Sequence, residues 1–148
     1  RTVATPRSSR SIETAMRSGP ESGLDWLLEL CDSGVTYRSR YMVAPEWLPV
    51  LDLLVRDDSN PRSVAFQVRG LTDFVRRIEV LHGPFGGHVL ARDAQHLSEL
   101  APQDLAPDNP LLLSLLASLR NGAYSLSDEI TLKFFTHAQP RSMLHLAA

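Results

Sequence analysis

Residues 57–81 read Asp57-Asp58-Ser59-Asn60-Pro61 followed by RSVAFQVRGLTDFVRRIEVL, and this stretch decides the fold. Asn60 is a favourable N-cap and Pro61 suits the first helical position, so the sequence predicts a helix from Pro61 to Leu81. At 100° per residue, six apolar side chains share one sector: Val64, Ala65, Val68, Leu71, Val75 and Ile78. Polar side chains lie opposite them: Arg62, Arg69, Asp73 and Arg76. Phe74 and Leu81 widen the apolar side, which is typical of a helix flanked by two neighbours in a bundle.

Upstream, a capping box formed by Ser22 and Asp25 predicts the start of a helix. Its apolar stripe consists of Leu24, Leu27, Leu28 and Cys31. Gly34 either ends this helix or is tolerated inside a longer one, and we prefer continuation to Met42, which places Tyr37 and Tyr41 on one face. Pro45 and Pro49 then restart the chain. A short apolar helix follows, carrying Leu48, Leu51, Leu54 and Val55.

Downstream, two breaks are predicted from glycine and proline. The first is the loop from His82 to His88, after which a weaker amphipathic segment runs to about Leu100. The second is the linker 101–110, where Asn109-Pro110 opens a helix carrying Leu112, Leu115, Leu116 and Leu119. Asn121-Gly122 is a candidate interruption, and a second capping box, Ser125 to Asp128, predicts a last helix ending near His137.

Composition agrees with this helical pattern. The 148 residues are 43% hydrophobic and 22% charged, include 24 leucines and show no sustained strand alternation. We therefore predict an all-α fold, a bundle of about five to six mostly antiparallel helices with Pro/Gly-rich connections. The expected organisation is a flexible lead over residues 1–21, a bundle over 22–138 and a tail over 139–148.

Charge, cysteine usage and hydropathy exclude several classes of protein. A formal net charge of −2 argues against a nucleic-acid partner, and no apolar run approaches the roughly 20 residues of a membrane span. Cys31 is the only cysteine, which rules out an internal disulfide and favours the cytoplasm. The Ser/Arg-rich start without methionine suggests a fragment of a longer protein.

Five patterns bear on chemistry, and each has a structural explanation that we favour. The five histidines form no metal motif, so we expect no metal and no cofactor. The glycines of the loop 83–87 suit a plain turn better than a phosphate cradle. Arginines spaced seven residues apart indicate a solvated, ion-paired face more than an anion site. Glu129, Lys133 and His137 follow one another at i to i+4 spacing, and we favour a ladder of surface charges over a proton-transfer site. Cys31 is expected to be a buried hydrophobe and not a nucleophile.

A longer stretch, residues 50–67, resembles a signature of the bacterial alpha-E domain family, whose helical members have largely unknown activity. Two flanking segments are similar to family patterns, Tyr37-Arg38-Ser39-Arg40-Tyr41 and residues 126–137. The most specific part is Asn60-Pro61-Arg62-Ser63 with Phe66-Gln67. Family members occur alone or fused behind a circularly permuted ATP-grasp domain, and are associated with transglutaminase-like proteins. The family's Glu-x-x-Arg pattern has no counterpart in this chain.

The resemblance implies a role beside amide-bond-forming ligases that act on peptides, with an ATP-grasp domain as partner in cis or in trans. We therefore expect a non-catalytic helical module. Its polar or partner-binding residues are predicted to be Asn60, Arg62, Ser63 and Gln67, with Arg38 and Arg40 on an adjacent helix. Two alternatives stay open. One is an enzyme or binder that holds a carboxylate or phosphate through the clustered arginines, and the other is self-association through a bundle face.

Overall fold

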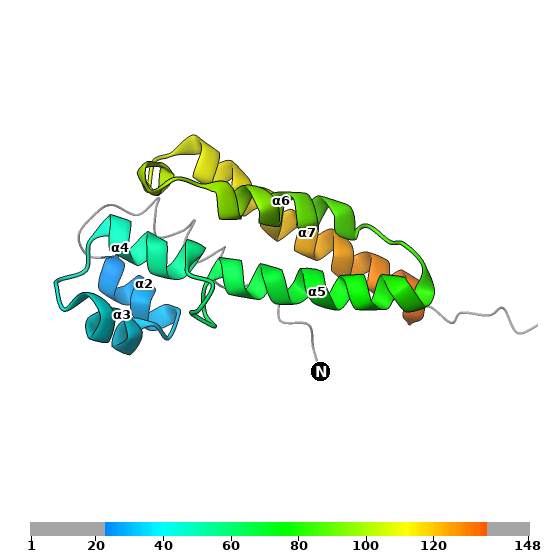
Figure 1. The fold of residues 1–148 in the computed structure, drawn as a ribbon, viewed down its shortest axis with the longest axis horizontal. Helices are drawn as coiled ribbons and strands as arrows, with labels where there is room; N and C mark the ends of the chain where they lie inside the picture. Colours follow the sequence, from blue (N-terminus) through cyan, green and yellow to red (C-terminus); the bar gives the residue numbers. More distant parts are fainter. Residues whose placement is uncertain (1–22, 136–148) are drawn as a thin grey trace, which may run out of the picture.

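The computed structural model describes residues 23–135, and the expected lead (1–21) and tail (139–148) lie outside them. Within the described range the chain is helical and contains no strand, which confirms the predicted fold class. Three long helices form the body of the molecule: α5 (Val64–His82), α6 (Gly87–Glu99) and α7 (Pro110–Phe134). Helix α6 packs against both α5 and α7, and the chain reverses direction between consecutive long helices (Figure 1).

Shorter helices gather at the end of the molecule where α5 begins (Figure 1). They are α2 (Leu24–Leu30), α3 (Gly34–Tyr41), α4 (Trp47–Leu51) and a π-helical turn, η1 (Asp52–Arg56). In η1 the Asp57 N–H donates to the Asp52 carbonyl at 3.0 Å, five residues back. Leu53, Leu54 and Val55 are all fully buried, so the apolar side chains of this turn all belong to the core. One hydrophobic core runs from these helices into α5, α6 and α7.

The preferred continuous helix to Met42 is wrong. The chain breaks at residues 31–33, where Asp32 adopts a left-handed backbone with φ 50°. The Ser33 hydroxyl donates to the Cys31 carbonyl at 3.1 Å inside this break, which redirects the chain so that Tyr37 is fully buried. Gly23 is the N-cap of α2, and Ser22 of the predicted capping box lies outside the described residues.

Two further helix boundaries differ from expectation. Helix α5 begins at Val64 after the N-cap Ser63, three residues later than Asn60 had predicted. Helix α7 begins as predicted after Asn109 but continues unbroken through Asn121-Gly122, so Ser125 opens no new helix. The reason is packing: a Cβ on Gly122 would lie 3.7 Å from a Leu90 methyl of α6, and Leu126 is buried. The linker contains a single 3-10 turn, η2 (Pro102–Asp104).

Candidate functional site

Two of the predicted polar residues, Asn60 and Ser63, are buried in the segment between η1 and α5, which we call the 57–63 junction. The Asn60 side chain donates to the Leu53 carbonyl at 3.0 Å and to the Ser33 hydroxyl at 3.5 Å, and its amide oxygen accepts from Arg62 N–H at 3.1 Å. The Ser63 hydroxyl donates to the Asp57 carbonyl at 2.6 Å and accepts from Phe66 N–H at 3.0 Å. These groups satisfy backbone atoms that would otherwise be buried without partners.

Arginines from two helices and from the junction itself form ion pairs around the 57–63 junction. Arg40 of α3 contacts the Asp57 carboxylate, and Arg69 of α5 donates to the Asp58 carboxylate at 2.7 Å. Arg62 reaches back to Asp32, in the break between α2 and α3, at 2.7 Å. The Arg62 and Asp32 side chains are 55% and 76% exposed, so this pair is accessible to solvent and salt.

Asp57 has the most perturbed electrostatics in the junction. Burial alone would raise its pKa, but hydrogen bonds from the Ser59 hydroxyl and N–H, together with the Arg40 guanidinium, lower the pKa below its usual value. The same pair raises the pKa of Arg40. Asp57 is therefore held as a carboxylate whose acceptor positions are used within the chain.

Of the other two predicted residues, Gln67 contacts the junction and Arg38 lies apart from it. Arg38 is exposed, forms no ion pair within residues 23–135, and lies over Gly34, where a Cβ would be 3.5 Å from a guanidinium nitrogen. Gln67 is half-buried and donates to the Pro61 carbonyl at 3.5 Å. The structure thus brings Asn60, Arg62 and Ser63 into one junction with Arg40 at its edge. It does not direct the guanidinium groups of Arg38, Arg40 and Arg62 toward one anion.

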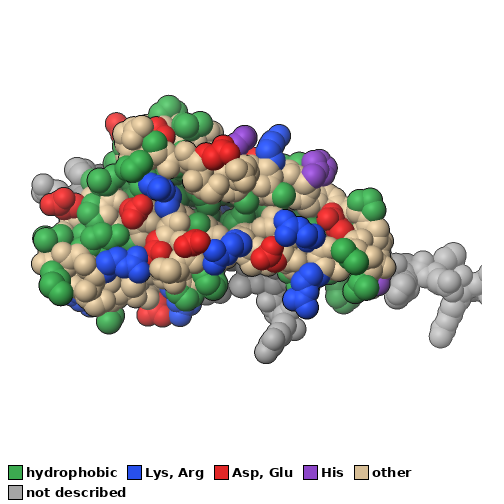
Figure 2. Space-filling view, viewed as in Figure 1, with side chains coloured by type: hydrophobic (Ala, Val, Ile, Leu, Met, Phe, Trp, Pro, Cys, Tyr) green, Lys and Arg blue, Asp and Glu red, His purple; other side chains and the backbone are tan. Residues whose placement is uncertain are grey.

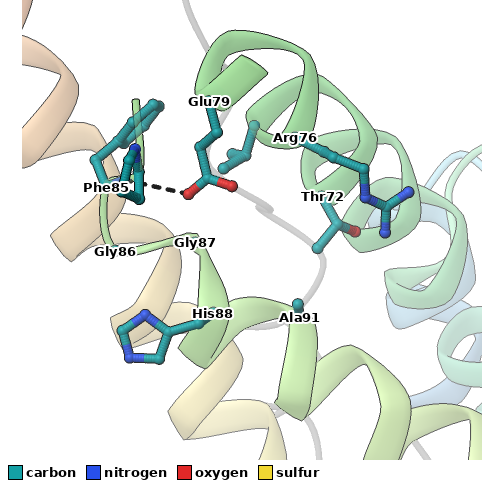
Figure 3. Close-up of a pocket in the computed structure, with 10 residues that line it drawn as sticks. Thr72, Arg76, Glu79, Phe85, Gly86, Gly87, His88 and Ala91 are labelled. Carbon is teal, nitrogen blue, oxygen red and sulfur yellow. Dashed lines mark hydrogen bonds between the residues drawn. The ribbon is translucent and has the colours of Figure 1, made fainter. Parts of the chain in front are cut away.

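A second polar region, which the sequence did not single out as a site, is the 83–86 turn between α5 and α6. A pocket of about 450 Å³ lies there (Figure 3). Figure 3 shows the Glu79 carboxylate pointing toward the turn, where it accepts from Phe85 N–H at 3.2 Å, while the His88 imidazole points away from α5. Helix α6 approaches α5 closely here, because a Cβ on Gly87 would lie 2.5 Å from a Val75 methyl.

Helix α7 supplies two further charges at this turn, those of Lys133 and Glu129. The Lys133 ammonium donates to the carbonyls of His82 and Gly83 at 2.8 and 3.4 Å, at the C-terminal end of α5. The Glu129 carboxylate lies against Gly86 at the start of α6, where a Cβ on Gly86 would be 2.3 Å from a carboxylate oxygen. A cation at a helix C-terminus and an anion at a helix N-terminus are both favourable. Glu129 therefore places a carboxylate beside the loop to which a phosphate would bind in the alternative considered above.

Two further hollows border α6. One, of about 480 Å³, runs along α5 and includes Arg56, Arg69 and Arg76, which pair with Asp52, Asp58 and Asp73. Figure 2 shows acidic and basic side chains interspersed on this face of the molecule. The other, of about 570 Å³, lies between α6 and α7 beside Asp93. That carboxylate is buried and accepts hydrogen bonds from Ser118 and Arg92.

No cluster of three or more histidine, cysteine, aspartate or glutamate side chains suitable for a metal occurs within residues 23–135. The third member of the predicted ladder, His137, lies outside this range. Cys31 is 6% exposed, and burial raises the pKa of its thiol to about 11. It is therefore a buried thiol at neutral pH, as its apolar stripe predicted.

Comparison with known proteins gives one match, to a family model. The Alpha-E model, described as a predicted alpha-helical domain with a conserved ER motif, matches residues 3–135. The 148 residues contain neither a glutamate followed directly by arginine nor a Glu-x-x-Arg tetrad. No curated protein and no solved structure matches the chain. In the described range, none of the helices has the length and hydropathy required to cross a membrane. Because the match covers most of the sequence, the chain belongs to the Alpha-E family.

Proposed function

We propose that this chain is a non-catalytic helical module that binds a partner protein through apolar side chains on its α2–α4 end. The partner implied by the family resemblance is an ATP-grasp ligase that forms amide bonds on peptides. In this proposal the ligand is a protein and not a small anion. We place the interaction in the cytoplasm.

The observation that carries the proposal is the set of large apolar side chains exposed on the short helices. Figure 2 shows several green side chains at this end of the molecule, among tan, blue and red groups. Val35 of α3 is 76% exposed and Met42, the residue after α3, is 85% exposed, although Tyr37 of the same helix is completely buried. The set comprises Trp26, Leu30, Val35, Met42, Val43 and Leu48. Exposed apolar patches are typical of protein-binding sites, and we propose that these side chains form one.

The internal ion pairs support this proposal over the arginine-based alternative. A carboxylate or phosphate ligand would have to displace Asp57 from Arg40 and Asp32 from Arg62. Asn60 and Ser63 are likewise committed to backbone groups. If the alternative were correct, Arg62→Ala would abolish binding of a small carboxylate or phosphate while leaving helicity unchanged.

Calorimetry of this chain against an ATP-grasp ligase from the same genome tests the proposal. The double variant Val35→Glu/Met42→Lys keeps the net charge and places each charge at the favourable end of α3. The matched control, Leu111→Glu/Val80→Lys, does the same on α7 and α5, at side chains that are 57% and 81% exposed. We expect at least tenfold weaker binding by the α3 variant and less than twofold change by the control. Equal affinity of all three proteins, or no binding by the folded wild type, would overturn the proposal.

A further inference from the structure

The outward face of α5 carries two phenylalanines on either side of a glycine. Phe66 and Phe74 are 37% and 47% exposed, whereas Val64, Val68 and Val75 on the inward face are buried. Gly70 lies midway between them, four residues from each, so the three residues form one line along the helix. Among the described residues no atom lies within 4 Å of the place where a Cβ on Gly70 would stand. A second helix therefore has room to approach α5 most closely at Gly70.

This line is symmetric about Gly70, so a two-fold axis at Gly70 would bring the same residues of two identical chains together. In an antiparallel pair of α5 helices with the two-fold axis at Gly70, Phe66 of one copy lies at the height of Phe74 of the other. The two rings of each copy then pack against the two rings of the second copy. Glycine at the crossing point lets the two backbones approach closely enough for these contacts.

The charges beside this line are complementary under the same symmetry. Arg69 and Asp73 are four residues apart and so share one flank of α5. In the antiparallel pair, Arg69 lies about 3 Å along the axis from Asp73 of the second copy, and the contact occurs twice. Each group now has an exposed partner within its own chain, Arg69 with Asp58 at 2.7 Å and Asp73 with Arg76 at 3.3 Å. Such solvent-exposed pairs exchange at small cost.

We propose that a second copy of this chain docks antiparallel on the Phe66–Gly70–Phe74 line of α5. The contact area of one helix face is small, so the dimer is expected to form with a dissociation constant on the order of 10 µM or weaker. This interface lies on a different helix from the α2–α4 surface of the proposed function.

Sedimentation equilibrium of the chain alone, over concentrations from about 1 µM to about 1 mM, tests this dimer independently of any ligase. Gly70→Glu introduces a better helix former into open space, so the monomer is expected to keep or raise its thermal midpoint while the dimer weakens at least tenfold. Leu111→Glu, which adds the same charge at a 57% exposed side chain of α7, is the control and leaves the dimer unchanged.

The charge contacts are tested separately by reversal. Arg69→Asp alone and Asp73→Arg alone each weaken the dimer, and the double reversal recovers most of the lost affinity, since the antiparallel pairing is restored. A wild-type chain that stays monomeric throughout, or a Gly70→Glu chain that dimerises like the wild type, would overturn the proposal. Additive weakening by the two reversals would exclude the antiparallel arrangement.

Discussion

The 57–63 junction and the 83–86 turn both lead into a long helix, but they are stabilised by different means. In the junction, buried Asn60 and Ser63 bond to backbone groups of neighbouring segments, the most distant of them in η1. In the turn, Gly83 and Gly86 supply positive φ angles of 80° and 24°. The charges there come from nearby Glu79 and from Glu129 and Lys133, which lie more than forty residues along the chain.

The junction therefore depends on buried hydrogen bonds, whereas the turn depends on charges placed at the ends of helices. The bond from the Asn60 side chain to the Leu53 carbonyl is buried, so removing Asn60 leaves a buried carbonyl unsatisfied. The contacts of the turn are closer to solvent, and Lys133 itself is exposed. We therefore expect substitutions in the junction to cost more than substitutions in the turn, and the predictions below test that order.

The largest effect is expected from Asn60→Ala. The change removes the bonds to Leu53 and Arg62 and leaves their backbone groups without partners, at a cost of about 2–4 kcal/mol. Asn109→Ala is the matched control, because Asn109 also precedes a proline but caps an accessible helix end, and it should cost about 1 kcal/mol. Urea unfolding of both variants measures the difference. Equal losses would show that burial is not what distinguishes the junction.

A smaller effect is expected from Gly86→Ala in the turn. The new Cβ collides with the Glu129 carboxylate and also meets an unfavourable φ, which together should cost about 1–2 kcal/mol. Combining it with Glu129→Ala removes the collision, so the double-mutant cycle should show a coupling of about 1 kcal/mol. Additive free energies of unfolding would mean that Glu129 does not lie against the turn.

Acid should weaken the junction through Asp57. Its pKa is lower in the folded chain than the unperturbed value of about 3.9, so its contribution is complete above that value and is lost as the pH falls through the folded pKa. Asp57→Asn removes this proton-linked loss. The variant's free energy of unfolding, measured by urea titration at a series of pH values below about 5, should therefore fall less steeply than that of the wild type. Parallel pH dependences would contradict the assignment.

The smallest effect is expected at Asp32, on the outer side of the junction. Asp32→Gly loses the exposed ion pair with Arg62 but relieves the left-handed backbone, so its net effect should stay within about 0.5 kcal/mol. Asp32→Ala loses the pair and keeps the strain, and should cost about 1 kcal/mol more than the glycine variant. Thermal unfolding of the pair separates the two contributions, and equal midpoints would remove the argument from strain.

Much of the fold follows from apolar spacing and local capping, and the exceptions depend on distant contacts. Asn109-Pro110 begins α7 as predicted, and the Asn109 amide oxygen caps Leu111 N–H. Asn60 makes the equivalent bond with Arg62 N–H, but α5 begins only after Ser63, whose hydroxyl donates to the Asp57 carbonyl and caps Phe66 N–H. The Tyr37–Tyr41 contact, with ring centroids 4.9 Å apart, was predictable from an i to i+4 spacing.

The candidate site was less predictable than the fold for the same reason. The spacing of Arg38, Arg40 and Arg62 does not reveal that Asp57 and Asp32 pair with two of them, because those pairs form only when α2 and α3 pack beside the junction. Likewise, Glu129 and Lys133 indicated a surface ladder, but the helix ends that they contact are set by the packing of α5 and α6 against α7.

The contact of Lys133 with the end of α5 also matters for chemical modification, because lysine is so rare in this chain. The 148 residues contain 14 arginines and one lysine. Acylating reagents and lysine-modifying enzymes therefore have a single side-chain target, and it is the ammonium that binds the last carbonyls of α5. Acetylation would remove its charge and most of its donor capacity. Among the side chains, amine-directed labelling or surface coupling would for this reason act at the α5–α6 connection and leave the arginines chemically intact.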